Sequence, residues 1–240
     1  MSLLQHLEEL RKRILWSLVS LLVAAVPCWV FKEEMVAFLQ APVLAKLPVG
    51  EKLVFLGVAD ILFLYLKVVG LAALFLAAPF VLFQLWLFVS PALYRRERLY
   101  VLPFLVFGSL FFLGGGAFAY YLAFPKAVDF LLGMSTQFKA VPEAQRYFGF
   151  LLTVILGMAL MFELPVLIVL LSAIGVVTPG FLIRKFRWAV VLIFTAAAIV
   201  TPTPDIMNLC LFAVPALVLY LLGVGVAWLL SPGRKEAAAP

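Results

Sequence analysis

The chain has 240 residues, of which 66% are hydrophobic and 12% are charged, and its mean hydropathy is +1.19. A typical globular protein is roughly 45–50% apolar and about 25% charged. So few polar residues could not cover the exterior of a soluble fold, which excludes soluble enzymes and disordered chains. A net charge of +6 would indicate a nucleic-acid partner only if the basic residues shared one face, and they are spread along the chain. The composition predicts an all-α polytopic membrane protein with no nucleic-acid partner.

The reactive side chains are too few for catalysis or metal binding. The chain has one histidine, His6, and two cysteines, Cys28 and Cys210, both within apolar runs. A zinc site requires three or four ligands, and a nucleophile requires a neighbouring base. No glycine-rich phosphate loop ending in Gly-Lys-Ser/Thr occurs, so the chain has no nucleotide motor of its own. We therefore expect a protein that is not an enzyme and that holds no metal and no cofactor.

Apolar runs between charged clusters predict six transmembrane helices. A bilayer core about 30 Å thick requires roughly 20 apolar residues in a helix. The fifth run has 14 residues and spans only about 21 Å at ~1.5 Å per residue, so it requires shielding or a thinner bilayer. A short sixth helix is also compatible with the sequence. Residues 1–232 are expected to form one bundle and residues 233–240 a flexible cytoplasmic tail. The predicted spans are about 14–31, 60–89, 99–123, 147–175, 188–201 and 207–230.

The basic residues predict the orientation of this bundle. An even number of spans places both termini on one side, together with the 90–98 and 176–187 loops. That side carries eleven basic residues in four short segments, and the opposite side carries six in three segments. The positive-inside rule therefore places both termini in the cytoplasm. The two outer loops, about 32–59 and 124–146, contain short amphipathic stretches such as Met35–Leu39, which we expect to lie along the membrane surface.

Glu163 is the most unusual residue, because it lies near the middle of the fourth predicted span. A charged carboxylate at that depth costs at least ~2.5–3.5 kcal/mol on insertion scales, so it should face protein or water. Pro165 adds polar character, because it frees a backbone carbonyl one turn earlier. Two interpretations stay open. Glu163 is either a proton-linked, partner-docking or water-lined site, or a protonated carboxyl that is hydrogen-bonded to a neighbouring helix.

Two further polar features lie within or beside the spans. Lys67 lies about two turns inside the second span, where snorkelling to the interface explains it. Thr201, Thr203 and Asp205 alternate with prolines in a rigid turn before the sixth span. Asp205 can cap that span, a contact worth ~1 kcal/mol, and the alternative is a contact point for another chain.

Acidic residues also lie in two cytoplasmic segments. Near the amino terminus, Glu8 and Glu9 can pair with Lys12 and Arg13 at i,i+4 spacing. In the 90–98 loop, Glu97 stands among three arginines. By themselves both patterns are typical of solvated surfaces, and neither would indicate a site.

Taken together, these segments resemble the TatC family, the multispanning signal-peptide receptor of the twin-arginine protein translocase. No single block is decisive, but their order and their spacing against six spans, over about residues 5–230, make the resemblance specific. The blocks that carry it are 6–13, 88–98, 162–179 and 201–215.

The resemblance implies a receptor and core scaffold in the bacterial cytoplasmic (inner) membrane. It would bind Arg-Arg signal peptides of folded cargo proteins on its cytoplasmic face and admit their apolar stretch to a concave face of the bundle. It would recruit single-span partners of the TatA/TatB type in a complex with several copies, and export would be driven by the proton gradient, to which Glu163 would respond.

The resemblance also implies roles for individual residues. Glu9 and Glu97 match the glutamates that contact the arginine pair, which agrees with the bidentate geometry of arginine–carboxylate pairs. Glu163 matches an intramembrane contact for signal peptide and partners, and Pro42 a sensitive proline of the first outer loop. The remaining matches are Arg11, Phe88, Pro91, Leu93 and Tyr94 in the signal-recognition region, and Thr201 and Asp205 on the partner-docking surface.

Two residues depart from the family pattern, and one rival function stays open. Asp60 and Leu221 stand where a glutamate is expected, which weakens predictions of polar contacts along the sixth helix. The rival is a proton-coupled small-molecule secondary transporter that uses Glu163 and Lys67. An intramembrane enzyme would lack a plausible catalytic pair.

Overall fold

The computed structural model describes residues 3–46, 52–89, 101–133, 142–201 and 205–230. Within these ranges the chain is helical apart from short connections, and the only β-type pairing is one isolated bridge between Val54 and Glu143. The elements in chain order are α1 (Leu3–Val30), α2 (Lys32–Leu44), α3 (Asp60–Val89), α4 (Val101–Phe118), the π-helical segment η3 (Ala119–Ala123), α5 (Phe124–Gly133), α6 (Ala144–Phe162), α7 (Leu164–Ala173), α8 (Pro179–Arg184), α9 (Phe186–Val200) and α10 (Ile206–Leu230).

Five helical stretches in the described part of the chain are long and apolar enough to cross a bilayer. One further apolar helix, α9, has 15 residues and coincides with the fifth predicted run, where a short helix was expected. The sixth run forms α10, which has 25 residues, so the expectation of a short sixth helix was wrong. The protein is therefore a multi-pass membrane protein, and the crossing by α9 stays a prediction. The five long stretches are His6–Val30, Asp60–Val89, Leu102–Gly133, Ala144–Ala173 and Ile206–Leu230.

The third long helix continues past the point where the sequence predicted an outer loop. Pro125 has no N–H to donate to the carbonyl of Tyr121, and the chain there forms the π-turn η3, in which the Phe124 N–H donates to the Ala119 carbonyl. Residues 124–133 then continue as α5. Phe124, Ala127 and Val128 of α5 are buried, so this stretch is part of the bundle and not an exposed loop.

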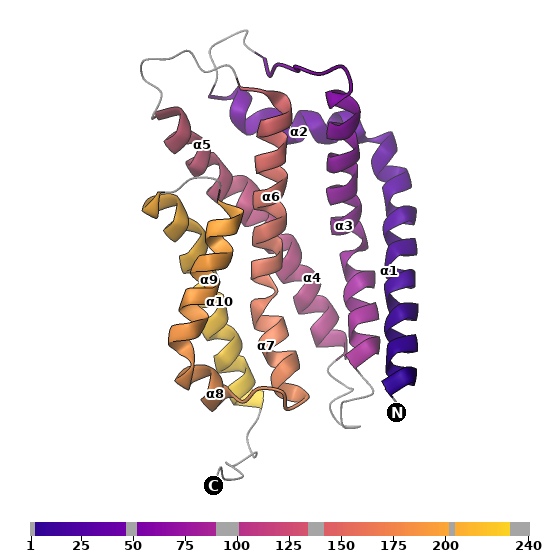
Figure 1. Cartoon of the computed structure of the whole chain (residues 1–240), viewed down its shortest axis with the longest axis vertical. Helices are drawn as coiled ribbons and strands as arrows, with labels where there is room; N and C mark the ends of the chain where they lie inside the picture. Colours follow the sequence, from indigo (N-terminus) through magenta and orange to yellow (C-terminus); the bar gives the residue numbers. More distant parts are fainter. Residues whose placement is uncertain (1–2, 47–51, 90–100, 134–141, 202–204, 231–240) are drawn as a thin grey trace.

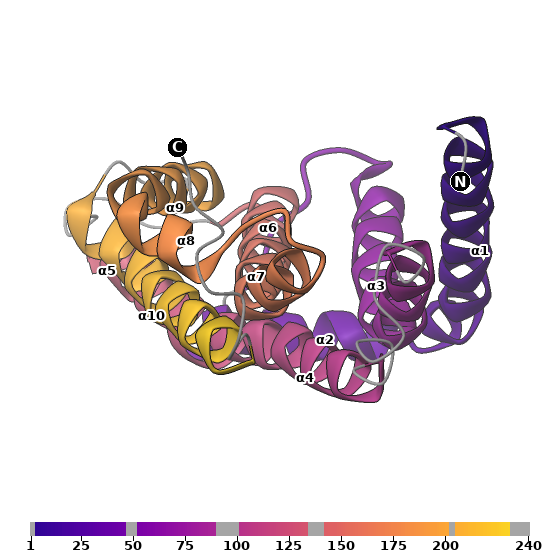
Figure 2. The same cartoon turned by 90° about the horizontal axis from the view of Figure 1, so that it is seen from below.

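The long helices lie along a curved line and do not close into a compact bundle (Figures 1 and 2). In Figure 2 this line runs from α1 at one edge, through α3, α4, α6 and α7, to α9 and α10 at the other edge. The start of α1, the end of α3, α8 and the end of α10 lie at one end of the molecule, drawn at the bottom of Figure 1. We call this the terminal end. The helix α2 lies across the opposite end.

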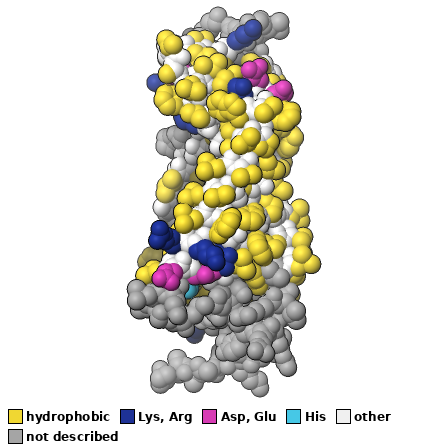
Figure 3. Space-filling view, turned by 90° about the vertical axis from the view of Figure 1, so that its right-hand side faces the viewer, with side chains coloured by type: hydrophobic (Ala, Val, Ile, Leu, Met, Phe, Trp, Pro, Cys, Tyr) yellow, Lys and Arg dark blue, Asp and Glu magenta, His cyan; other side chains and the backbone are white. Residues whose placement is uncertain are grey.

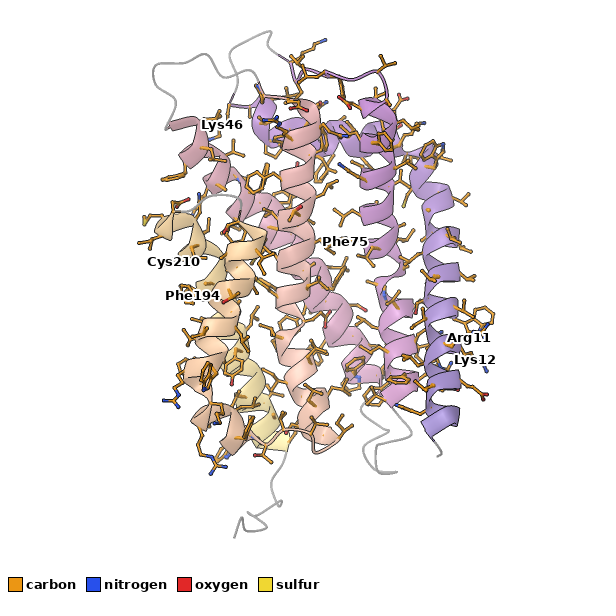
Figure 4. All side chains as sticks on the ribbon, viewed as in Figure 1. Arg11, Lys12, Lys46, Phe75, Phe194 and Cys210 are labelled. Atoms are coloured by element: carbon orange, nitrogen blue, oxygen red, sulfur yellow. The ribbon has the colours of Figure 1, made fainter. Side chains whose placement is uncertain are left out.

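The packing of the central helices depends on glycines, at which two helices approach closely because no side chain separates them. A Cβ added to Gly115 of α4 would lie 2.7 Å from the carbonyl oxygen of Met158 and 2.8 Å from the Cα of Ala159, both in α6. Small residues allow this close approach of backbones, which lipid-embedded helices use in place of a hydrophobic driving force. The neighbouring Gly116 faces the ring of Phe75, which projects from the side of α3 opposite to α1 (Figure 4).

The helix α1 is less enclosed than the others, because among the long helices it packs mainly on α3. Ala24 and Cys28 of α1 form a small buried cluster with Val69, Ala73 and Ala77 of α3. The outward face of α1 is apolar along its length and charged near both ends (Figure 3). The apolar run 14–31 has 18 residues, which is about 27 Å of helix and close to the thickness of a bilayer core.

We predict that Gly115→Leu destabilises the bundle. The added side chain must displace the α6 backbone, and overpacking of this kind costs about 1–3 kcal/mol. The thermal unfolding midpoint of the purified protein in detergent should therefore fall. Gly114→Ala is the matched control, because no atom lies within 4 Å of the added Cβ. Equal midpoints for the two variants would show that the α4–α6 contact does not require the glycine.

Candidate functional site

Glu9, the first predicted recognition residue, lies at the terminal end in an ion pair with Arg13, one turn later on α1. The pairing predicted from i,i+4 spacing is thus confirmed. Arg13 also crosses to α3, where its Nη1 donates to Oε1 of Gln84 at 3.2 Å. The side chains of Glu9 and Arg13 are 25% and 21% exposed, and Gln84 is 5% exposed. Arg13 therefore connects the partly exposed carboxylate of Glu9 to the buried amide of Gln84.

Phe88 lies at the same junction, one helical turn after Gln84 on α3. Its ring stacks on His6 of α1, with 4.5 Å between ring centroids and 26° between the ring planes. The sequence predicted a role for Phe88 but none for His6 or Gln84. The only signal for these two residues was position, since His6 is the first residue of the matched block 6–13 and Gln84 lies one turn before Phe88.

Arg11 does not face this junction. It is exposed on the outward side of α1, where Arg11 and Lys12 project away from the bundle (Figure 4). Arg11, Lys12, Leu15 and Trp16 line a shallow groove there together with neighbouring residues. Two residues apart on an α-helix means about 200° of rotation. The structure therefore places Glu9 and Phe88 where α1 meets α3, and it places Arg11 on the outward side of α1.

Four of the predicted recognition residues lie outside the described residues. These are Pro91, Leu93, Tyr94 and Glu97, in the segment between the end of α3 and the start of α4. The two helix ends that flank this segment lie at the terminal end, where Glu9 also lies (Figure 1).

Glu163 stands at the break between α6 and α7 and is 7% exposed. Its Oε2 faces Gly108 of α4, where an added Cβ would lie 3.6 Å away. Within the described part of the chain, its Oε1 has no hydrogen-bond partner. A buried polar atom without a partner costs about 1–3 kcal/mol. Pro165 in the first turn of α7 has no N–H to continue the helix, which accounts for a break at this point.

The turn before α10 is held by local hydrogen bonds. The backbone N–H of Asn208 donates to Oδ1 of Asp205 at 2.7 Å, and the Asn208 amide donates to Oδ2 at 2.9 Å. This confirms the predicted cap. The Thr201 hydroxyl donates to the carbonyl of Ala197 at 2.9 Å. In Figure 1 the end of α9 and the start of α10 lie well short of the level that α6 reaches at the opposite end, so the polar groups of these two helix ends stand deeper in the molecule than those of an ordinary outer loop.

Pro42 lies inside α2 and has a structural consequence there. Because proline has no N–H, the carbonyl of Phe38 loses its helical donor. The hydroxyl of Tyr120 in η3 donates to that carbonyl at 2.6 Å, and the two rings stack. Tyr147 of α6 donates to the next carbonyl, of Leu39, at 3.0 Å. The proline thus exposes an acceptor through which α2 docks on the bundle.

Metal binding finds no support in the described residues. No three side chains of His, Cys, Asp or Glu among them come close enough to hold a metal ion.

The ion pairs that the described residues show beyond Glu9–Arg13 are Lys46–Asp129, at 2.7 Å between α2 and α5, and Glu143–Arg146, at 2.8 Å near the start of α6.

We predict that the contribution of Tyr120 to stability depends on Pro42. Tyr120→Phe removes the hydroxyl that satisfies the Phe38 carbonyl and should lower the unfolding free energy by about 1 kcal/mol. In a Pro42→Ala background the restored N–H satisfies the carbonyl, so the same change should cost less. Unfolding of the single and double variants in detergent forms a double-mutant cycle. Tyr121→Phe is the control because Tyr121 is exposed, and strictly additive effects would contradict the coupling.

Comparison with known proteins gives one family throughout. Residues 5–215 match the family model for the Sec-independent protein translocase protein TatC. The TatC protein of Koribacter versatilis is 46% identical over 239 residues, covering 98% of this chain and 88% of the relative. That of Desulforapulum autotrophicum is 36% identical, covering 92% and 82%. A crystal structure of the twin arginine translocase receptor TatC has a TM-score of 0.81 and 32% identity, covering 94% of this chain and 99% of that one. The chain therefore belongs to the TatC family, a family of protein-translocase components and not of enzymes.

Proposed function

We propose that this protein is the signal-peptide receptor and core scaffold of a twin-arginine translocase. The observation that carries the proposal is the Glu9 carboxylate, held partly exposed at the terminal end, where α1 meets α3. The solved relatives support it, since they are twin arginine translocase receptors and match over nearly the whole chain.

The terminal end is proposed to face the cytoplasm of a bacterial cell, with the protein in the cytoplasmic membrane and both termini inside. Exposed basic residues support this orientation, because positive charge marks cytoplasmic loops. Among the described residues, acids are fewer at the terminal end, which carries Glu8 and Glu9, than at the opposite end, which includes the exposed acids Glu33 and Glu34. The exposed basic residues of the terminal end include Arg11, Lys12, Arg184, Lys185 and Arg187.

Recognition is proposed to rest on paired carboxylates, Glu9 and Glu97, that receive the two arginines of the signal peptide. A guanidinium donates two parallel hydrogen bonds to a carboxylate, which a lysine ammonium cannot do. Phe88, stacked on His6, would support the apolar residues beside the arginine pair. The other proposed members of this site are Pro91, Leu93 and Tyr94. Arg11 is proposed to contact the signal peptide separately, from the outward side of α1 (Figure 4).

Single-span subunits of the TatA/TatB type are proposed to dock on the α9–α10 side, in a complex with several copies. Thr201, Asp205 and Glu163 would provide polar contacts there and along the concave face. The end of α9 and the start of α10 lie short of the level of the start of α6, which supports this, because polar groups are left at depth there (Figure 1). Export is proposed to draw on the proton gradient.

Binding of a fluorescent Arg-Arg signal peptide to the full chain in detergent tests the receptor function. We expect a Lys-Lys peptide, and the variants Glu9→Ala and Glu97→Ala, to bind about tenfold more weakly or worse, since each loses charge-assisted hydrogen bonds. Glu33→Ala, which removes an exposed acid at the opposite end, is the matched control and should bind normally. Equal binding in all cases would refute the receptor proposal and favour the alternative of a secondary transporter. Such a transporter would show substrate-dependent proton uptake without a partner protein.

A proton-linked role for Glu163 makes a separate prediction. Glu163→Gln keeps the shape of the side chain and removes its ability to ionise. Transport of a twin-arginine cargo into inverted membrane vesicles should then respond less steeply to the size of the proton gradient. Ser172→Ala, at another buried polar position in the following helix, should keep the native response. An unchanged response in Glu163→Gln would exclude the proton-linked role.

A further inference from the structure

We propose that Gln84 is a positioning residue of the signal-peptide site, acting through Arg13 on Glu9. The proposal rests on the proposed function, since it assumes that Glu9 binds an arginine of the peptide. Gln84 itself does not contact the peptide. Its role is to fix the Arg13 guanidinium, which in turn fixes the carboxylate that receives the ligand.

The three side chains form a graded series from the interior to the surface. Gln84 is buried on α3 at 5% exposure, Arg13 is 21% exposed, and Glu9 is 25% exposed. Arg13 uses separate nitrogens for its two partners, Nη1 toward Gln84 and Nη2 toward Glu9. Because the guanidinium is planar and rigid, fixing one of its edges on Gln84 also fixes the direction of its other edge.

The ion pair alone would not hold Glu9 in one place. Exposed i,i+4 pairs on a helix are worth about 0.3–0.5 kcal/mol, and they compete with the rotamer freedom of two long side chains. A third partner on a different helix changes this, because α3 packs along α1. The stack of His6 on Phe88 provides a second contact between the same helices, so Glu9 lies between two contacts.

This arrangement bears on the choice between arginine and lysine. The Arg13 pair uses Oε1 of Glu9, so the charge attraction of the carboxylate for any further cation is already reduced. What then separates an arginine from a lysine is the direction of the hydrogen bonds, which a guanidinium forms as a rigid fork. Direction is useful only if the acceptor is held still. Gln84 therefore contributes to specificity more than to attraction.

A purely competitive role for Arg13 predicts the opposite result. If Arg13 were an internal substitute that the peptide must displace, releasing it from Gln84 would free Glu9 and tighten binding. The positioning role predicts weaker binding and poorer discrimination. The sign of the change therefore distinguishes the two.

The test measures binding of the Arg-Arg and Lys-Lys signal peptides to the full chain carrying Gln84→Met. Methionine has a similar length but no oxygen to accept from Arg13. We expect the affinity for Arg-Arg to fall about three- to tenfold, as for the loss of one hydrogen bond, while the affinity for Lys-Lys changes less than about twofold. Gln84→Glu keeps an acceptor oxygen at the same distance from the backbone, so it should keep the native ratio of Arg-Arg affinity to Lys-Lys affinity.

Cys28→Ala is the matched control, because it loosens the same α1–α3 contact at a buried site distant from Glu9 along the helix. It should lower the unfolding midpoint without changing the affinity ratio. An unchanged ratio in Gln84→Met, or tighter Arg-Arg binding, would overturn the proposal. If Gln84→Met does not fold, Gln84→Asn, whose amide falls short of Arg13, must show the same fall in ratio. If Glu9→Ala binds normally in the same assay, the proposed function fails at Glu9 itself.

Discussion

In the apolar part of a bilayer, a polar group must find its partner inside the protein. This constraint accounts for most of the specific contacts in the structure. The carbonyl that Pro42 frees in α2 is taken by the hydroxyl of Tyr120. The turn into α10 is satisfied by Asp205 and Asn208. At the terminal end the buried side-chain oxygen of Gln84 accepts a hydrogen bond from Arg13. Each of these contacts either joins two helices or closes a turn, so satisfying the polar groups also fixes the arrangement of the bundle.

Apolar packing then has a different role from the one it has in a soluble protein. Lipid covers apolar side chains as well as a neighbouring helix does, so association depends on close approach and on polar contacts. Gly115 allows the α4 backbone to touch α6, and Gly223 of α10 lies against the backbone of Pro165 in α7, where an added Cβ would lie 2.7 Å away. Where such contacts are absent, as on the outward face of α1, the surface stays apolar and exposed (Figure 3).

The features that followed from local sequence are those set by hydrophobic runs and by proline. Each of the long apolar runs lies largely within a long helix, because the bilayer leaves the backbone few alternatives. The pairing of Glu9 with Arg13 and the cap by Asp205 followed from spacing alone. The extent of α5 did not, because the third predicted span ended at about residue 123, and the charged residues Lys126 and Asp129 follow it in the sequence. They are tolerated in a helix because it lies at the end of the bundle, where Asp129 pairs with Lys46 of α2.

The candidate site could be predicted only in part, for a related reason. A resemblance of sequence blocks pointed to Glu9 and Phe88, yet no periodicity within α3 distinguishes Gln84 from an ordinary buried polar residue. Its partner lies 71 positions away in the sequence, and a contact of that kind exists only once two helices are packed. The same holds for His6 and Phe88. Residues that orient a binding group do so through tertiary contacts. A sequence pattern can therefore indicate the binding residue, but it does not indicate the residues that orient it.

Glu9 and Glu163, the two acids for which functional roles are proposed, show how the same constraint can be met in opposite ways. Glu9 lies at the terminal end, and its carboxylate is paired with Arg13 and through it connected to a second helix, an arrangement suited to a binding group that must keep one direction. Glu163 lies at a helix break inside the bundle, and its Oε1 has no partner among the described residues. A buried acceptor without a hydrogen bond lowers the stability of the fold. Such a group is expected mainly at positions where it has a function. A group that arrives from outside the chain, a proton or a polar side chain of a partner, would relieve that cost on binding. The cost of leaving Oε1 of Glu163 without a partner among the described residues would therefore be a source of affinity for a group that completes it.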